Sequence, residues 1–187
     1  MAKIGLNNFR YAKLTETEDG GATYETPKKP GKAVSCNVEI ETSDARLYAD
    51  DGLAEYDSGF QSGTVTLGLD ELDIATEAEL LGHTVDQQTN AITRNVDDVA
   101  PYVGLGRVIV KMVNSVRKYK VEFLCKVKFA EPSEEDETKG EELEFRTPEL
   151  EGAVAQLGNG NWSHAAVFDT KAEAITYLEG LFTPAKP

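Results

Sequence analysis

The stretch YKVEFLCKVKF, residues 119–129, decides the fold class of this chain, because apolar residues occupy every second position without interruption. Alternation with a period of two is typical of a β-strand with one dry face. If the strand begins at Val116, it spans on the order of 40 Å, about twice the usual length. Such a strand needs an extended sheet to cover it, and neighbouring subunits can contribute to that cover. The residues expected on the dry face are Tyr119, Val121, Phe123, Cys125, Val127 and Phe129.

Other segments of the chain show strand patterns of the same kind. Residues 103–113 are apolar on both faces, which predicts a strand that lies between two layers or at a subunit contact. Asn159-Gly160 is the strongest hairpin signal in the chain and is expected to join the two strands that flank it. The remaining predicted strands cover residues 33–42, 63–69, 143–157 and 162–168.

Two helices are predicted from their capping residues. Asp73, Thr76 and Glu79 are placed to cap a short helix, and Gly82 is placed to end it. A capping box follows near the C-terminus, where Thr170 and Glu173 open a second helix. The residues therefore predict a mainly β fold with one short internal helix and one flanking helix at the C-terminal end.

Length, composition and net charge limit the number of domains and the classes of binding partner. The 187 residues are 40% apolar, which suffices for one core and predicts a single domain over residues 1–187. The net charge of −14 disfavours tight binding to nucleic acid or to anionic lipid surfaces. No secretion signal and no membrane span is recognised, so we expect a protein that is made and folded in the cytoplasm and has no membrane partner. Cys36 and Cys125 lie on predicted apolar faces, where a buried thiol is the common state and a disulfide is not implied.

The residues that could act in catalysis or metal binding are each explained more simply by a structural role. His83 follows the glycine that ends a helix, and His164 lies within a predicted strand, so both are expected to be structural or surface residues. Asp50, Asp51 and Glu55 supply oxygen ligands of the kind that calcium prefers, but their spacing is not that of a known calcium loop. A plain turn is favoured there, and cation binding is left open. We expect no enzyme, no catalytic residue, no cofactor and no metal site.

Lysines form islands in an acidic molecule. Lys118, Lys120, Lys126 and Lys128 share the polar face of the long strand. They are either a solvated surface or partners for acidic surfaces such as residues 134–142 or Glu39 and Glu41, within the subunit or on another copy. The second alternative favours ordered self-association. Residues 131–142 are too polar to pack and are expected to form an exposed loop.

Four long segments of this chain resemble the major tail tube proteins of long-tailed bacteriophages, particularly those of Gram-positive hosts. The resemblance lies in the combined length and order of these segments and runs nearly from end to end of the chain. The segments are LYADDGLAEYDSGFQSGTVTLGLDEL (47–72), APYVGLGRV (100–108), YKVEFLCKVKFAEPSEEDETKGEELEF (119–145) and FDTKAEAITYLEGL (168–181).

The resemblance implies a β-sandwich or barrel-like subunit that forms rings, commonly hexameric. The rings stack into a tube in the virion tail, assembled in the host cytoplasm, through which DNA passes transiently and without sequence specificity. The implied partners are further copies of the chain, the tape-measure protein, the tail terminator and the distal tail proteins. A basic lumen would hold DNA, because the duplex carries one negative charge per roughly 1.7 Å, whereas an acidic wall lets it slide.

Two sets of site residues follow from this expectation. An acidic, hydroxyl-rich strand face is the candidate lumen wall, and an apolar hairpin or long loop at residues 44–60 is the candidate contact between subunits. The side chains of that hairpin have the alternative of folding back onto their own sheet. The lumen candidates are Ser35, Asn37, Glu39, Glu41, Thr64 and Thr66, and the contact candidates are Leu47, Tyr48, Leu53, Tyr56 and Phe60.

Two other classes of function compete with a phage tail tube. The first is the inner tube of a contractile secretion or bacteriocin device, which shares the architecture and which a neighbouring sheath gene would favour. The second is a carbohydrate- or calcium-binding β-sandwich module, which requires exposed aromatic residues such as Trp162, Tyr102 and Tyr119 to form a platform. The predicted alternation instead directs Tyr119 toward the core.

Overall fold

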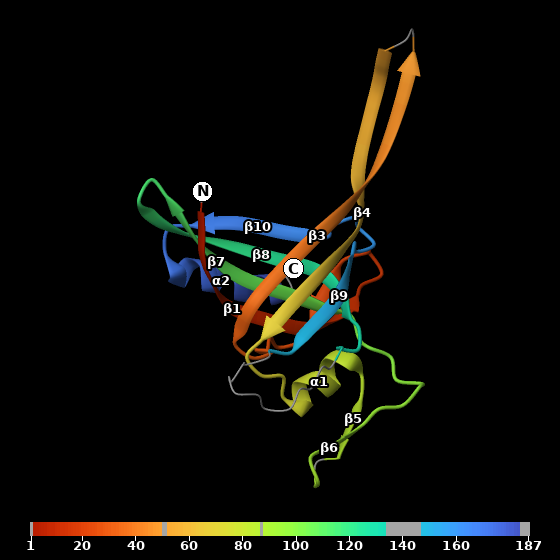
Figure 1. The fold of residues 1–187 in the computed structure, drawn as a ribbon, viewed down its shortest axis with the longest axis vertical. Helices are drawn as coiled ribbons and strands as arrows, with labels where there is room; N and C mark the ends of the chain where they lie inside the picture. The colour runs from red at the N-terminus through yellow and green to blue at the C-terminus, as the bar shows by residue number, and fades with distance from the viewer. Residues whose placement is uncertain (1, 50–51, 87, 134–146, 184–187) are drawn as a thin grey trace, which may run out of the picture.

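The computed structural model describes residues 2–49, 52–86, 88–133 and 147–183. Its elements are mainly antiparallel strands, with two short helices, so the predicted fold class is confirmed (Figure 1). In chain order the elements are β1 (Ala2–Glu16), β2 (Ala22–Tyr24), β3 (Ala33–Ala49), β4 (Gly52–Leu69), α1 (Ile74–Leu81), β5 (Thr84–Asp86), β6 (Ala91–Thr93), β7 (Val103–Val113), β8 (Val116–Phe129), β9 (Glu149–Ala155), β10 (Ser163–Phe168) and α2 (Lys171–Phe182).

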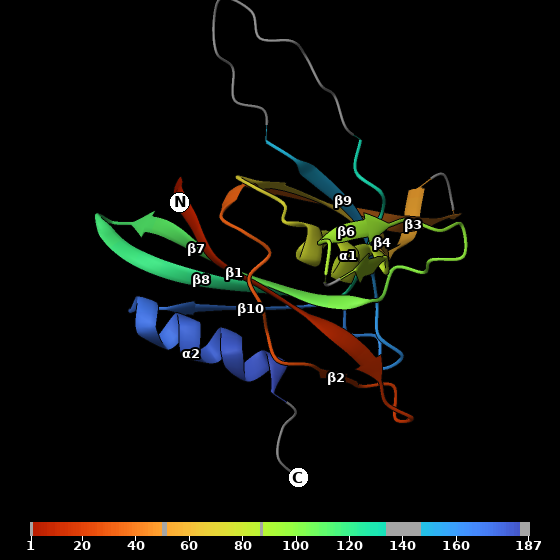
Figure 2. The same cartoon turned by 90° about the horizontal axis from the view of Figure 1, so that it is seen from below.

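One large sheet organises the described residues. Its strands follow the order β2-β1-β7-β8-β9-β4-β3, and β10 pairs with β8 beside this path. The sheet curls, so that β4 and β9 face β1 and β7 across an apolar interior, in a sandwich-like arrangement (Figures 1 and 2). A separate two-stranded sheet, β5 with β6, lies beside α1.

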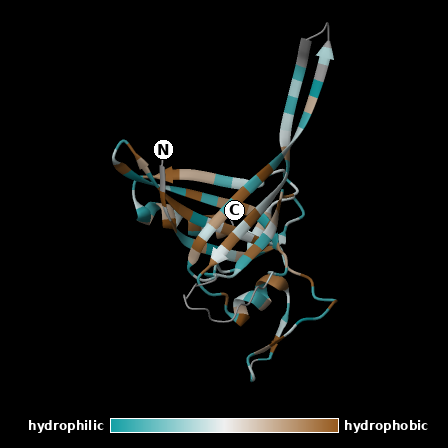
Figure 3. Ribbon diagram, viewed as in Figure 1, coloured by the Kyte–Doolittle hydropathy of each residue, from teal (hydrophilic) through white to brown (hydrophobic). Residues whose placement is uncertain are grey.

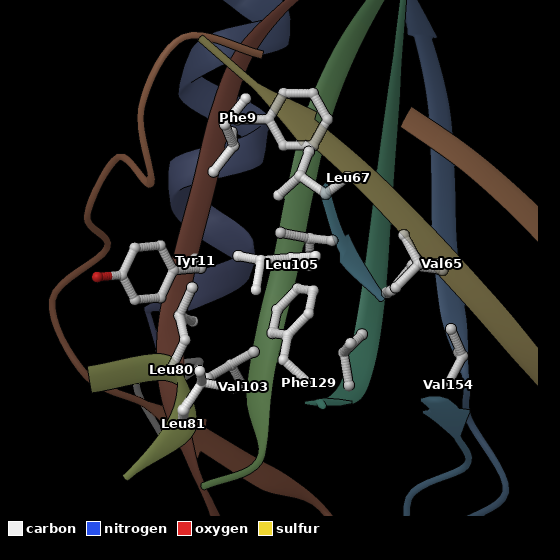
Figure 4. Close-up of a cluster of buried hydrophobic side chains, with 14 residues drawn as sticks. Phe9, Tyr11, Val65, Leu67, Leu80, Leu81, Val103, Leu105, Phe129 and Val154 are labelled. Carbon is white, nitrogen blue, oxygen red and sulfur yellow. The ribbon is translucent and has the colours of Figure 1, made fainter. Parts of the chain in front are cut away.

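Two apolar cores use opposite faces of β7 and β8. The inner core lies between the curled halves of the sheet and includes Phe9, Leu67, Leu105 and Phe129 (Figure 4). The second core lies between the sheet and α2, where Phe123 contacts Leu178 and Phe182 in the same cluster. The two-sided apolar pattern of residues 103–113 has this cause, because Leu105 faces the first core and Val108 the second.

The single dry face predicted for residues 119–129 is wrong. Val121, Phe123 and Cys125 face α2, whereas Val127 and Phe129 face the inner core on the other side of the sheet. The cause is a β-bulge, since Val103 pairs with Val127 but Leu105 pairs with Leu124, leaving one extra residue in β8. A bulge inserts one residue and exchanges the two faces of a strand, which an uninterrupted alternation in the sequence does not reveal.

Asn159-Gly160 forms a turn, but the hairpin predicted around it is wrong. Gly160 has a φ of +85°, and its backbone N–H donates to the carbonyl oxygen of Leu157 at 2.9 Å. The flanking strands do not pair with each other. β10 pairs with residues 119–124 of β8 and β9 pairs with residues 126–129, so the two lie one after the other along β8.

Both helices begin at their predicted caps. The side chain of Thr170 accepts from the backbone N–H of Glu173, and the Glu173 carboxylate accepts from Thr170 in return. Asp73 accepts from the backbone N–H of Thr76, and Gly82 ends α1 in the left-handed region. The capping role predicted for Glu79 is wrong, because this carboxylate accepts from the Tyr11 hydroxyl at 3.0 Å and pairs with Lys28 at 2.7 Å.

A buried arginine connects the two halves of the sheet. Arg107 in β7 donates to the carboxylate of Glu122 at 2.6 Å and, across the fold, to the carbonyl oxygen of Cys36 in β3 at 3.2 Å. Burial by itself raises the pKa of Glu122, but hydrogen bonds from Lys120 and Arg107 outweigh it and hold that pKa below its usual value. Arg107 thus links the β7–β8 pair to β3 on the other side of the fold.

The cysteines lie as their apolar-face positions predict. Cys125 is buried, Cys36 is half-buried, and the two are not joined by a disulfide. Burial raises the pKa of the Cys125 thiol to about 11, which keeps it protonated and unreactive.

Some predictions fall outside the described residues. Residues 134–142 of the predicted acidic loop, and the Asp50-Asp51 pair with its open question of cation binding, belong to this group. No helix in the described part of the chain is both long and apolar enough to cross a bilayer.

Candidate functional site

A two-stranded arm extends away from the rest of the molecule (Figure 1). We define the arm as residues 42–49 of β3 and 52–60 of β4, which pair with each other from Thr42↔Phe60 to Ala49↔Gly52. β9 pairs with β4 only at residues 63–68, so the arm strands have no other strand beside them in the described chain. At about 3.3 Å per residue, eight residues of strand give a reach of roughly 26 Å. The hairpin predicted at residues 44–60 is present.

One face of the arm has its charges satisfied locally. The hydroxyl of Tyr56 donates to Asp44 at 2.9 Å, and the Arg46 guanidinium lies 3.7 Å from Asp44. Arg46 also lies over the Tyr56 ring, 5.6 Å from its centroid. This set stabilises the ribbon, because a two-stranded hairpin alone is marginally stable in water.

The opposite face of the arm presents carboxylates. Asp57 pairs in register with Ala45, and Glu55 pairs with Leu47, which places both acidic residues on this face. Both side chains are exposed, and within the described residues neither has a hydrogen-bond or ion-pair partner. Hydrophilic positions recur along the arm in Figure 3. The arm thus offers unpaired negative charge far from the core.

The predicted contact residues divide into three groups. Tyr48 and Tyr56 are 64% and 53% exposed, so they do not fold back onto their own sheet. Phe60, at the base of the arm, stacks on Trp162 with ring centroids 4.7 Å apart, which is the alternative of packing within its own chain. The side chains of Leu47 and Leu53 lie outside the described part of the structure.

The predicted lumen residues lie together on one face of the sheet. Asn37 pairs in register with Thr66, and Glu39 pairs with Thr64, so their side chains are direct cross-strand neighbours. Ser35 and Glu41 extend the same row along β3. Thr66 is half-buried and the others are exposed. We call the outward face of β3, β4 and β9 the acidic face.

The sequence prediction missed further members of the acidic face. Glu149 and Glu151 of β9 pair with Gly68 and Thr66 and are exposed. The hydroxyl of Ser62 belongs to it as well and donates to Glu41 at 2.7 Å. The alternation of Glu149 and Glu151 with buried Leu150 indicated a strand with one acidic face. The sequence does not indicate that this strand, β9, lies beside β4.

Lysines border the acidic face on β8. Lys128 and Lys126 pair in register with Ala153 and Ala155 of β9, and thus lie on the same side of the sheet. Lys126 pairs with Glu16, and its ammonium group lies 4.4 Å from the centroid of the Tyr102 ring. Both lysines thus interact with residues of their own chain. Within the described residues, the carboxylates of β3 and β9 on the acidic face have no ion-pair partner.

The two histidines differ in burial and in partners. His83 is buried, with Nδ1 2.8 Å from Asp98 and Nε2 2.8 Å from Glu131, so it joins the loop after β6 to the segment after β8. The hydrogen bonds from His83 and from the backbone N–H of Asn95 hold the pKa of Asp98 below its usual value. His164 is exposed on β10. Among the described residues no group of three or more potential ligand side chains is placed to hold a metal ion.

The features that stand out in the described part of the chain are therefore the arm, an extended two-stranded ribbon, and the acidic face, a row of exposed carboxylates. Comparison with known proteins gives no independent assignment, since no protein-family model matches the chain and no curated protein is significantly similar to it.

Proposed function

We propose that this protein is a structural tail tube subunit that self-assembles into stacked rings, hexameric as in the family it resembles, and has no enzymatic activity. The arm is the observation that carries the proposal. A ribbon of roughly 26 Å that leaves its sheet, with exposed tyrosines and unpaired carboxylates, is marginal in isolation and is stabilised by contact with another molecule. A further copy of the chain is the partner that suits such a ribbon, as in the family that the sequence resembles.

The acidic face supports the same function. In a closed ring, Glu39, Glu41, Glu149 and Glu151 would repeat in every copy and line the bore with negative charge. Duplex DNA carries about one charge per 1.7 Å, so a wall of this sign repels the duplex and lets it slide. Hydroxyl groups such as that of Thr64 keep the surface hydrated between the carboxylates.

The partners of the proposed tube follow from its position in a virion tail. Each ring would meet further rings, with a tail terminator at one end and distal tail proteins at the other. A tape-measure protein would occupy the bore during assembly, and DNA would pass through it afterwards without base-specific contacts.

Electron microscopy of the purified protein, with sedimentation velocity across a concentration series, tests self-assembly. We expect annular particles or hollow filaments that grow as protein concentration rises. Persistent monomers at the highest concentration, both alone and with its tape-measure and distal tail partners present, would contradict the proposal.

Reversing charges on the acidic face is expected to make assembled tubes retain DNA. In the variant Glu39→Lys with Glu151→Lys, each copy adds two cations to the proposed bore, and tubes should bind duplex DNA in a salt-dependent manner. Retention is measured with fluorescent duplex at low salt. The matched control, Glu18→Lys with Glu25→Lys, makes the same charge change at exposed positions on other elements. Equal retention by variant and control would show that the acidic face does not line the bore.

A further inference from the structure

Three lysines stand in register across three strands at one end of the sheet. Lys3 of β1 pairs with Lys111 of β7, and Lys111 pairs with Lys118 of β8. Like charges directly opposite each other on an antiparallel ladder are destabilising. Lys118 pairs with Asp169, but Lys111 has no carboxylate partner within the described residues. We call Lys111 and Lys118 the lysine row.

The lysine row lies on a face of the sheet that nothing in the described chain covers. The row shares its face with Lys120, whereas Val121 and Phe123 point the other way, into the core beneath α2. Neither Figure 1 nor Figure 2 places another element over this end of the sheet opposite α2. Beside the row, Val167 pairs with Lys120 and is 59% exposed. The surface therefore combines unneutralised positive charge with exposed apolar area.

The arm has the complementary chemistry. Glu55 and Asp57 lie two residues apart on one face of a strand, so their side chains are separated by about 7 Å along it. Lysines opposite each other in a ladder are about 5 Å apart at Cβ, and their long side chains extend that reach. The two unpaired carboxylates of the arm thus match the spacing of Lys111, which has no carboxylate partner within the described residues, and Lys118, which also pairs with Asp169.

We propose that the arm of one copy docks on the lysine row of a second copy, with Glu55 and Asp57 facing Lys111 and Lys118. Within one chain the arm and the β7–β8 turn lie at different ends of the molecule, so the arm meets this surface only on another copy (Figure 1). The proposal rests on the proposed self-assembly and assigns the surface that receives the arm. It also accounts for cations that gather where, among the described residues, no carboxylate neutralises Lys111.

Charge exchange tests the docking. Lys111→Glu with Lys118→Glu, and separately Glu55→Lys with Asp57→Lys, should each raise the concentration needed for association at least about tenfold, because each places like charges in contact. The second pair of changes lies on the exposed arm and leaves the sheet intact. Combining all four changes in one chain should restore association to within about threefold of the wild type. Sedimentation velocity gives the concentrations, and circular dichroism melting shows that each variant is folded.

The matched control is Lys29→Glu with Lys171→Glu, which makes the same charge change at exposed positions and should associate like the wild type. The docking is wrong if Lys111→Glu with Lys118→Glu associates like this control, or if the fourfold variant is folded but not restored. It is also wrong if that lysine variant associates normally and loses only low-salt binding of duplex DNA, which would make the row a nucleic-acid contact. A wild-type chain that stays monomeric throughout instead refutes self-assembly itself.

Discussion

Shortening the arm is expected to abolish self-association and leave the body of the subunit folded. The variant replaces residues 45–57 with Asn-Gly, so that Asp44 and Ser58, which are direct partners in the ladder, are joined by a two-residue turn. The removed residues pair only with each other, and both cores lie outside them. The concentration required for association should rise by at least about a hundredfold, measured by sedimentation velocity.

Two outcomes would contradict this account of the arm. Tubes formed by the shortened chain at wild-type concentrations would show that subunits associate through other surfaces. A shortened chain that no longer folds would show that the arm packs on its own sheet, which is the alternative that Phe60 follows in this structure. Circular dichroism and thermal melting of the variant distinguish the two.

Phe123→Ala is expected to give the largest loss of stability among single changes in β8. The side chain is 1% exposed, and its ring meets those of Tyr24 and Phe182 edge to face at 5.3 and 4.9 Å. Removing a buried phenylalanine leaves a cavity and lowers the free energy of unfolding by about 3–5 kcal/mol. Since domains of this size are stable by about 5–15 kcal/mol, much of the total would be lost.

Urea unfolding of the arm-shortened chain measures this loss without a contribution from self-association. The control is Val116→Ala in the same strand, where the side chain is 55% exposed and the change should stay within about 0.5 kcal/mol. Equal effects of the two substitutions would mean that α2 does not pack on β8 as described.

The local elements could be predicted from the sequence where one signal dominates. The capping box at Thr170 and Glu173 and the cap at Asp73 depend only on neighbouring residues, and the structure has both. The hairpin at residues 44–60 was predictable because its turn signal separates two segments that pair locally. Such features require no knowledge of what lies across the sheet.

Features that depend on the third dimension were not predictable. The bulge in β8 exchanges faces between Cys125 and Val127, close to the point where pairing with β10 ends and pairing with β9 begins, and the sequence alternates through this point. Asn159-Gly160 suggested a hairpin because the turn depends only on neighbouring residues. That both flanking strands pair with β8 depends on residues far away in the sequence.

The candidate surfaces follow the same division. The alternation in β3 put Asn37 and Glu39 on one face of their strand, and that in β4 did the same for Thr64 and Thr66. That the two sets share one face of the sheet is seen only in the register pairs. Glu149 and Glu151 were missed because the periodicity of a strand does not predict which strand lies beside it. The register pair of Lys3 with Lys111 could not be predicted either, because only the pairing of β1 with β7 brings these two positions together.

A reconstruction of assembled wild-type particles by electron cryomicroscopy tests the central claim most directly. The account predicts a ring or tube in which every arm lies against another copy and the carboxylates of Glu39 and Glu151 point into the bore. Arms that end in solvent, or a bore walled by lysines, would contradict it.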